Sequence, residues 1–138
     1  MKYLLDTNVV SELRKKNPAA PVLSWIQLRD PLDLHISVIT IFEIRLGIEL
    51  RARKDPQQGQ LLNDWLQRLL AQAYFGRILP MDEAVAVRAA GLHVPDPRPE
   101  RDAFIAATAL THSMTLITRN VTDFHVPGLQ VHNPWVTN

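Results

Sequence analysis

Short apolar stretches alternate with longer helix-like segments along the whole chain, and this alternation limits the fold more than any other feature of the sequence. The first stretch, Lys2–Leu5, leads directly into a helical pattern at Thr7–Arg14. Further strands are predicted at Leu34–Ile36, Arg77–Leu79, Thr115–Thr118 and Leu129–His132. Strands separated by helices predict an α/β fold with a short, mostly parallel central sheet of about four or five strands, flanked by helices on both faces.

The segments between these strands predict the remaining helices. They cover Pro21–Leu28, Val38 to about Arg53, a stretch that carries Leu62, Trp65, Leu66 and Leu69, Glu83 to about Leu92 after a capping Asp82, and Arg101–Thr111. On the helix that begins at Val38, we expect the buried face to carry Ile39, Leu46 and Leu50. The last helix has small residues at Ala103, Ala106 and Ala107, so it can pack closely on a sheet.

The composition is typical of one compact domain. The chain has 138 residues, of which 46% are hydrophobic, so it can bury a core of its own, and we expect a single domain over residues 1–138. It has no cysteine, which excludes disulfides and thiolate metal sites. Asp6 interrupts the apolar start of the chain, and no apolar run is long enough to cross a bilayer. These features predict a cytoplasmic protein without membrane contact.

The overall charge does not indicate a partner. Lys and Arg number 15 against 14 Asp and Glu, a balance that neither favours nor excludes nucleic acid. Two local clusters are basic, Arg14-Lys15-Lys16 and the group of Arg51, Arg53 and Lys54. Solvated helix ends explain each cluster taken alone.

Asp6 lies where the first predicted strand ends. In open parallel sheets, functional groups gather beyond the carboxyl ends of the strands, so this position favours a role in a site. The alternative is that Asp6 only caps the helix that follows.

Glu43 shares its predicted helix face with Leu46 and Leu50, so its carboxylate is expected among apolar side chains. An unpaired buried charge is costly, and Glu43 therefore needs either a ligand or a basic partner. Arg45 projects from roughly the opposite side of the helix, so a basic partner has to come from elsewhere in the chain.

Two further acids accompany elements in the last third of the chain. Asp102 lies in the first turn of a helix, where the helix dipole favours a negative charge and is a sufficient explanation by itself. Asn120 and Asp123 follow the fourth strand, where a turn or cap role explains Asp123 as well as metal binding does. Carboxylates from strand ends and helix starts can nevertheless converge at one edge of the sheet, and hard divalent cations such as Mg²⁺ or Mn²⁺ prefer such oxygen ligands.

Four segments resemble the motifs of the PIN-domain nucleases, and in particular those of the VapC-type toxins. They are Leu4–Asn8, Ser37–Ile44, Asp102–Leu110 and Leu116–Phe124. Their order, their spacing and the total length agree with that family from nearly the first residue to the last. The resemblance implies a PIN-like fold and a metal-dependent endoribonuclease that acts as the toxin of a toxin–antitoxin pair.

The resemblance also implies roles for individual residues. The acids that would bind metal and catalyse are Asp6, Glu43, Asp102 and Asp123, with Asp123 preferred over Asn120 as the fourth. The residues expected to support these acids or to contact RNA are Asn8, Thr118 and Asn120. Arg119 and Arg45 lie close in sequence to the presumed acidic site, so either could contact the RNA backbone.

The implied cofactor is Mg²⁺, with Mn²⁺ as a substitute. The implied substrate is RNA, attacked in line at phosphorus by a metal-activated water without a covalent enzyme intermediate. VapC-type toxins are held inactive by a cognate VapB-type antitoxin and commonly form dimers, so an antitoxin and a homodimer are both expected here.

Other classes of protein fit the sequence less well. A phosphatase that forms an aspartyl-phosphate, or a phosphorelay receiver, needs a second acid near Asp6, and this chain has Asn8 two positions on. The five histidines show no metal-ligand spacing. A non-catalytic PIN-like module that binds RNA or a protein is the alternative from another class, and Mn²⁺ binding without cleavage of any RNA would indicate it.

Overall fold

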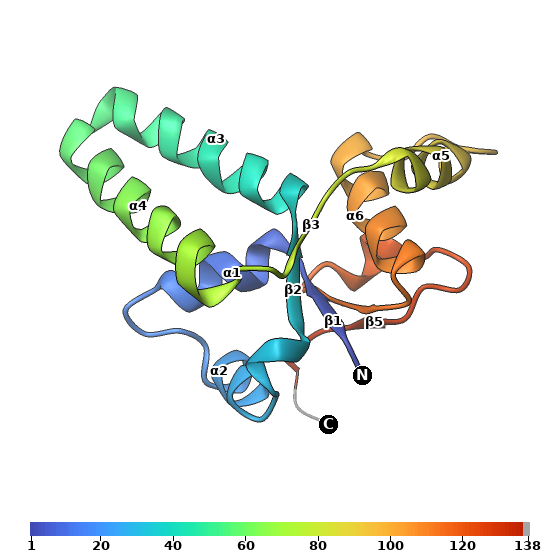
Figure 1. Ribbon diagram of the computed structural model, residues 1–138, viewed down its shortest axis with the longest axis horizontal. Coiled ribbons are helices and arrows are strands. Elements are labelled where there is room, and N and C mark those ends of the chain that lie inside the picture. The colour runs from blue at the N-terminus through green and yellow to red at the C-terminus, as the bar shows by residue number, and fades with distance from the viewer. Residues whose placement is uncertain (137–138) are drawn as a thin grey trace.

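The computed structural model describes residues 1–136, and in that range the chain forms five strands and six α-helices (Figure 1). The strands are β1 (Tyr3–Leu5), β2 (Leu34–Ser37), β3 (Ile78–Leu79), β4 (Thr115–Ile117) and β5 (Val131–His132). The helices are α1 (Thr7–Arg14), α2 (Ala20–Gln27), α3 (Val38–Lys54), α4 (Pro56–Arg68), α5 (Glu83–Gly91) and α6 (Glu100–Thr111). Short helical turns cover Pro31–Asp33, Leu69–Ala73 and Val121–Phe124. None of the helices in residues 1–136 combines the length and the apolar character that a membrane crossing requires.

The five strands form one sheet with the order β3-β2-β1-β4-β5. Every strand pairing is parallel, so the predicted α/β fold is confirmed and the sheet is parallel throughout rather than mostly parallel. Tyr3 of the central strand lies opposite Leu34 of β2 on one side and opposite Thr115 of β4 on the other. The chain builds one half of the sheet with β2 and β3 before it crosses to β4 and β5. A crevice for ligands typically forms where the strand order changes direction in this way, beyond the carboxyl ends of the strands.

The sheet is buried on both faces because successive residues of β1 point to opposite sides. Leu5 is fully buried in a cluster that contains Val9 of α1 and Ile44 of α3. Leu4, also fully buried, belongs to a second cluster with Ile105 of α6. Figure 1 shows the same two layers, with the α3–α4 pair on one side of the sheet and α5 and α6 on the other. A strand that is apolar at every position is expected in such a sheet.

The predicted packing of the small-residue face of α6 is confirmed, and the apolar face of α4 also packs into the core. Ala106 of α6 is buried in the cluster that includes Leu4, and Ala107 is buried against α5. Leu66 of α4 is buried in the first cluster, where its neighbours Leu62, Trp65 and Leu69 also pack. The apolar face of α4 therefore contributes to the core.

The predicted buried face of α3 is wrong at Leu46 and Leu50, although Ile39 is partly buried against the cluster that contains Leu4. The helix buries Thr40, Ile44 and Ile48, whereas Leu46 and Leu50 are 39% and 56% exposed. Apolar residues occur on every side of this helix, so their spacing does not select one face, and packing against α1 and α4 decides the orientation. Glu43 consequently lies beside the buried stripe and is half-buried.

Candidate functional site

The Asp6 carboxylate is buried at the carboxyl end of β1. Its Oδ1 accepts a hydrogen bond from the backbone N–H of Thr7 at 2.8 Å, and its Oδ2 accepts one from the hydroxyl of Thr118 at 2.8 Å. Burial raises the pKa of this carboxyl from its usual 3.8 to about 6, and the charges of Glu43 and Asp102 also raise it, against the two hydrogen bonds. Asp6 therefore caps α1, as one interpretation of the sequence had it, and also lies within reach of two other acidic charges.

The hydroxyl of Thr118 joins polar groups from two neighbouring strand ends. It is fully buried, donates to Asp6, and accepts from the side-chain amide of Asn8 at 3.2 Å and from the backbone N–H of Asn120 at 3.1 Å. Asn8 Oδ1 in turn accepts from the backbone N–H of Arg119 at 3.3 Å. A hydroxyl has one hydrogen and two acceptor positions, so these bonds use Thr118 fully and fix the Asp6 carboxylate.

Glu43 is held by α1 as well as by its own helix. Its Oε1 accepts the hydroxyl hydrogen of Thr7 at 2.6 Å. The hydroxyl oxygens of Thr7 and Thr40 lie 3.1 Å apart, and because Thr7 gives its one hydrogen to Glu43, Thr40 must be the donor between them. Sequence reasoning missed both threonines. The position of Thr7 directly after Asp6, at the turn from strand to helix, is the signal that could have identified it.

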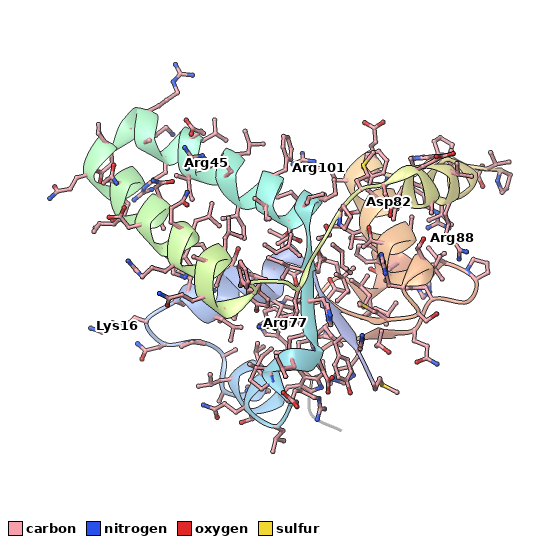
Figure 2. The ribbon with its side chains drawn as sticks, in the orientation of Figure 1. Lys16, Arg45, Arg77, Asp82, Arg88 and Arg101 are labelled. Atoms are coloured by element: carbon pink, nitrogen blue, oxygen red, sulfur yellow. The ribbon has the colours of Figure 1, made fainter. Side chains whose placement is uncertain are left out.

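The basic partner of Glu43 is Arg101, which the sequence alone did not identify. Its Nη1 lies 3.6 Å from Glu43 Oε2, and its guanidinium lies over the Phe42 ring, 5.5 Å from the centroid. Figure 2 shows Arg101 between α6 and the start of α3. Charge-assisted hydrogen bonds are typically about 2.7–2.9 Å long, and the two side chains are 48% and 26% exposed, so this ion pair is loose. Arg45 instead pairs with Glu49 at 2.8 Å.

Asp102 and Asp123 extend the acidic group. Asp102 lies in the first turn of α6 and is partly buried, and Asp123 is exposed in the turn that follows β4. Burial raises the pKa of Asp102, the charges of Asp123 and Glu43 raise it further, and Arg101 lowers it. The structure therefore links the four acids expected from the sequence into one electrostatic group, in which Asp123 acts on Asp102, and Asp102 and Glu43 act on Asp6.

These donors suit a hard divalent cation, although they do not form a closed cage. Within residues 1–136, no three acidic or histidine side chains lie close enough together to bind one ion. Mg²⁺ is commonly bound through one or two carboxylates and keeps several of its waters, so the arrangement fits it without a third direct ligand. A cation would also relieve the repulsion between like charges that raises the pKa of Asp6 and of Asp102.

Arg119 and Asn120 follow β4 but do not touch the acids with their side chains. The Arg119 guanidinium lies over the Trp135 ring, 5.2 Å from its centroid, and no acid among the described residues forms an ion pair with it. Asn120 is exposed, and among the described residues only its backbone is tied to the site: its N–H donates to Thr118, and its carbonyl oxygen accepts from the backbone N–H of Asp123 at 3.0 Å. A contact of either side chain with RNA stays a prediction.

Comparison with known proteins assigns the family. The family model of the PIN domain matches residues 3–126, a range that includes all four motifs singled out in the sequence. The chain belongs to the PIN domain family. This PIN domain is 35% identical over 137 residues to Toxin FitB of Neisseria gonorrhoeae, covering 96% of the chain and 97% of that protein. It is 34% identical over 137 residues to VapC ribonuclease Y4jK of Sinorhizobium fredii, covering 96% of each.

A solved structure agrees with this assignment. FitAB bound to an IR36 DNA fragment contains a chain that is 34% identical to this PIN domain and superposes on it with a TM-score of 0.88, over 99% of this chain and 97% of that one. The resemblance to PIN-domain nucleases and VapC-type toxins is thereby confirmed.

The burial of Asp6 makes the stability of this PIN domain pH-dependent. The pKa of Asp6 is about 6 in the folded chain, against 3.8 for an unperturbed carboxyl, so the folded chain binds the proton more tightly than the unfolded chain. The stability of the fold therefore falls as the pH rises between these two values. A shift of about two pKa units corresponds to roughly 3 kcal/mol. Asp6→Asn retains a helix cap without the charge. In the metal-free state we expect this variant to be more stable than wild type by up to roughly 3 kcal/mol near pH 7.5 and about equally stable near pH 4.

Urea unfolding in the presence of a chelator measures this difference at both pH values. Asp64→Asn, on the exposed side of α4, controls for the loss of a surface carboxylate. A stability difference between Asp6→Asn and wild type that is the same at both pH values would contradict the prediction.

Proposed function

We propose that this PIN domain is a metal-dependent endoribonuclease and the toxin of a VapBC-type toxin–antitoxin pair. The observation that carries the proposal is the group of four carboxylates whose charges act on one another where the strand order changes direction: Asp6, Glu43, Asp102 and Asp123. The relative named as a VapC ribonuclease supports the reaction, and Toxin FitB supports the role as a toxin. A single domain over residues 1–138 that acts in the cytoplasm belongs to the same proposal.

The four acids differ in how firmly they are held. Asp6 is buried and fixed by two hydrogen bonds, and Glu43 is oriented by the Thr7 hydroxyl, so these two form the rigid part of the site. Asp102 and Asp123 are more accessible, and the charge of Asp102 acts on Asp6 while that of Asp123 acts on Asp102. The chemistry that Mg²⁺, or Mn²⁺ in its place, supplies in such a site is positive charge for the phosphate oxygens and a lowered pKa for the attacking water. No side chain needs to form a bond to phosphorus.

The residues around the acids act by holding them in place. Thr118 and Asn8 position Asp6 through the hydroxyl network, and they are positioning residues in this proposal. Asn120 and Arg119 are kept as proposed RNA contacts. Arg101 forms a loose ion pair with Glu43 in the metal-free protein, so a cation that binds at Glu43 has to compete with it.

The direct test is cleavage of total cellular RNA by the purified protein with Mg²⁺, with the ends of the products mapped. We expect cleavage at defined positions. Asp6→Asn and Asp102→Asn should lower the rate by more than about 100-fold, since even groups that only support metal ligands are worth 10- to 100-fold. Arg88→Ala, on the exposed side of α5, is the control. Mn²⁺ binding without cleavage of any RNA would identify the non-catalytic PIN-like module instead.

Metal binding can be measured without turnover by calorimetric titration with Mn²⁺. Glu43→Gln and Asp102→Asn should weaken binding severely because each removes a negative charge from the site. Arg101→Ala should strengthen it by about two- to fivefold, the range that one exposed ion pair allows. Thermal melts check that each variant is folded. Unchanged Mn²⁺ affinity in both acid variants would refute the site.

A protein partner is part of the proposal because FitB belongs to the FitAB complex that was solved on DNA. We propose a VapB-type antitoxin as this partner, and a homodimer of the chain. Expression of the chain alone should slow growth, and co-expression of a small protein from the adjacent reading frame should restore it. Asp6→Asn expressed alone should leave growth unaffected. Harmless overproduction of soluble protein that cleaves RNA would remove the toxin assignment and leave the nuclease assignment standing.

A further inference from the structure

A groove leads away from the acidic site between α1, α3 and α4. It has a volume of about 450 Å³ and shares Thr7 and Glu43 with the site. Arg14 of α1, Arg51 of α3 and Trp65 of α4 also line it. The groove and the site therefore form one continuous surface.

The spacing along the helices gives the groove its direction. On α3, Glu43, Gly47 and Arg51 recur every four residues and all line the groove. At a rise of 1.5 Å per residue, Arg51 lies about 12 Å along the helix from Glu43. On α1, Thr7 and Arg14 lie two turns apart on one face in the same way. The two basic clusters that the sequence alone explained as solvated helix ends thus each contribute one arginine to the lining of this groove, Arg14 beside Trp65 and Arg51 farther along α3.

Neither of these arginines is neutralised by the protein itself. Both are exposed, and no carboxylate within residues 1–136 forms an ion pair with Arg14 or Arg51. The Arg14 guanidinium lies 6.0 Å from the centroid of the Trp65 ring, a cation–π contact that leaves its charge in place. Two free cations in the lining of a groove that begins at the acidic site match a polyanion that has one phosphate at the site and further phosphates beyond it.

Gly47 leaves the groove open between its two ends. Glycine inside a helix costs roughly 1 kcal/mol relative to alanine. Packing does not require a glycine at this position, because a Cβ at Gly47 would have no atom within 4 Å. Gly59 of α4 is the contrast, since a Cβ there would lie 2.5 Å from the Cβ of Ala52. Helix packing therefore explains Gly59 but not Gly47, whose lack of a side chain keeps the groove clear between Glu43 and Arg51.

We infer that the groove holds a single-stranded segment of RNA on one side of the scissile phosphate, with its backbone passing over Gly47 and its phosphates at Arg51 and Arg14. This inference rests on the proposed function and specifies how the substrate is held. The groove has the volume of a small-molecule pocket, which suits a few nucleotides of one strand, whereas proteins recognise duplex RNA by its shape across wide grooves. The substrate therefore needs at least two nucleotides beyond the cleaved bond on that side.

The test is RNA binding without turnover. In an Asp102→Asn background with Mg²⁺, a fluorescein-labelled, mixed-sequence single strand of about 12 nucleotides is titrated at several salt concentrations. Arg14→Ala and Arg51→Ala should each weaken binding about tenfold and lower the log–log salt slope by about 0.7. Gly47→Leu should weaken binding at least as much with an unchanged slope.

Two variants serve as matched controls. Gly47→Ala should retain most of the binding and melt no lower than the parent, which shows that side-chain size and not the loss of glycine is responsible in Gly47→Leu. Arg88→Ala should bind like the parent, because Figure 2 shows Arg88 on α5, across the sheet from α3 and α4. Thermal melts of every variant confirm that a loss of binding is not a loss of fold.

The outcomes separate this inference from the proposed function. Parent-like RNA binding in Arg14→Ala, Arg51→Ala and Gly47→Leu would overturn the groove assignment, while RNA cleavage by the wild type would keep the proposed function. Tighter binding of a duplex than of the single strand would also overturn it. If these variants lost only the co-expressed antitoxin and kept RNA, the groove would belong to a protein segment and the inference would be wrong. No binding and no cleavage of any RNA would overturn both.

Discussion

The Asp6 carboxylate lies out of water at the end of the central strand, where a negative charge is costly unless polar groups compensate for it. The backbone N–H of Thr7 is supplied by the start of α1, directly after the strand. The hydroxyl of Thr118 is available only because β4 is the neighbour of β1, in a register that places Leu5 opposite Ile117. The order of the sheet and the chemistry of the site therefore depend on the same strand pairing.

The candidate site lowers the stability of the metal-free fold. Like charges on Asp6, Glu43 and Asp102 act on one another, and within the described residues the loose contact of Arg101 with Glu43 is the one ion pair that offsets them. A protein selected only for stability would replace such a group with apolar or neutral residues. A cation that binds at the site would supply the missing positive charge. Because it binds only the folded state, its binding free energy would add to the free energy of unfolding. Rigid support of Asp6 and Glu43 from threonine hydroxyls keeps the acids in place in the meantime.

Much of the fold could be predicted from the sequence because its signals are local. Apolar stretches marked the strands, Asp82 marked a helix start, and acids after strand ends marked the site. The buried face of α3 could not be predicted, since apolar residues such as Ile44 and Leu46 lie on different sides and only contacts with other helices select between them. The pairing of Glu43 with Arg101, and the convergence of Arg14 and Arg51 on one groove, depend on how distant segments meet. No spacing along the chain encodes those contacts.

The pairing of β1 with β4 also determines how late the site can form during folding and synthesis. The hydrogen bond from Thr118 to Asp6 joins residues 112 positions apart, so it closes nearly the whole chain into a loop. Contacts of such long sequence separation form late, because the entropy of loop closure has to be overcome first. During synthesis, Asp6 and Glu43 leave the ribosome long before Asp102, Thr118 and Asp123 exist. A growing or truncated chain therefore carries half of the acids and supports Asp6 only through the backbone N–H of Thr7, and the complete site first forms after Thr118 and Asp123 have been added.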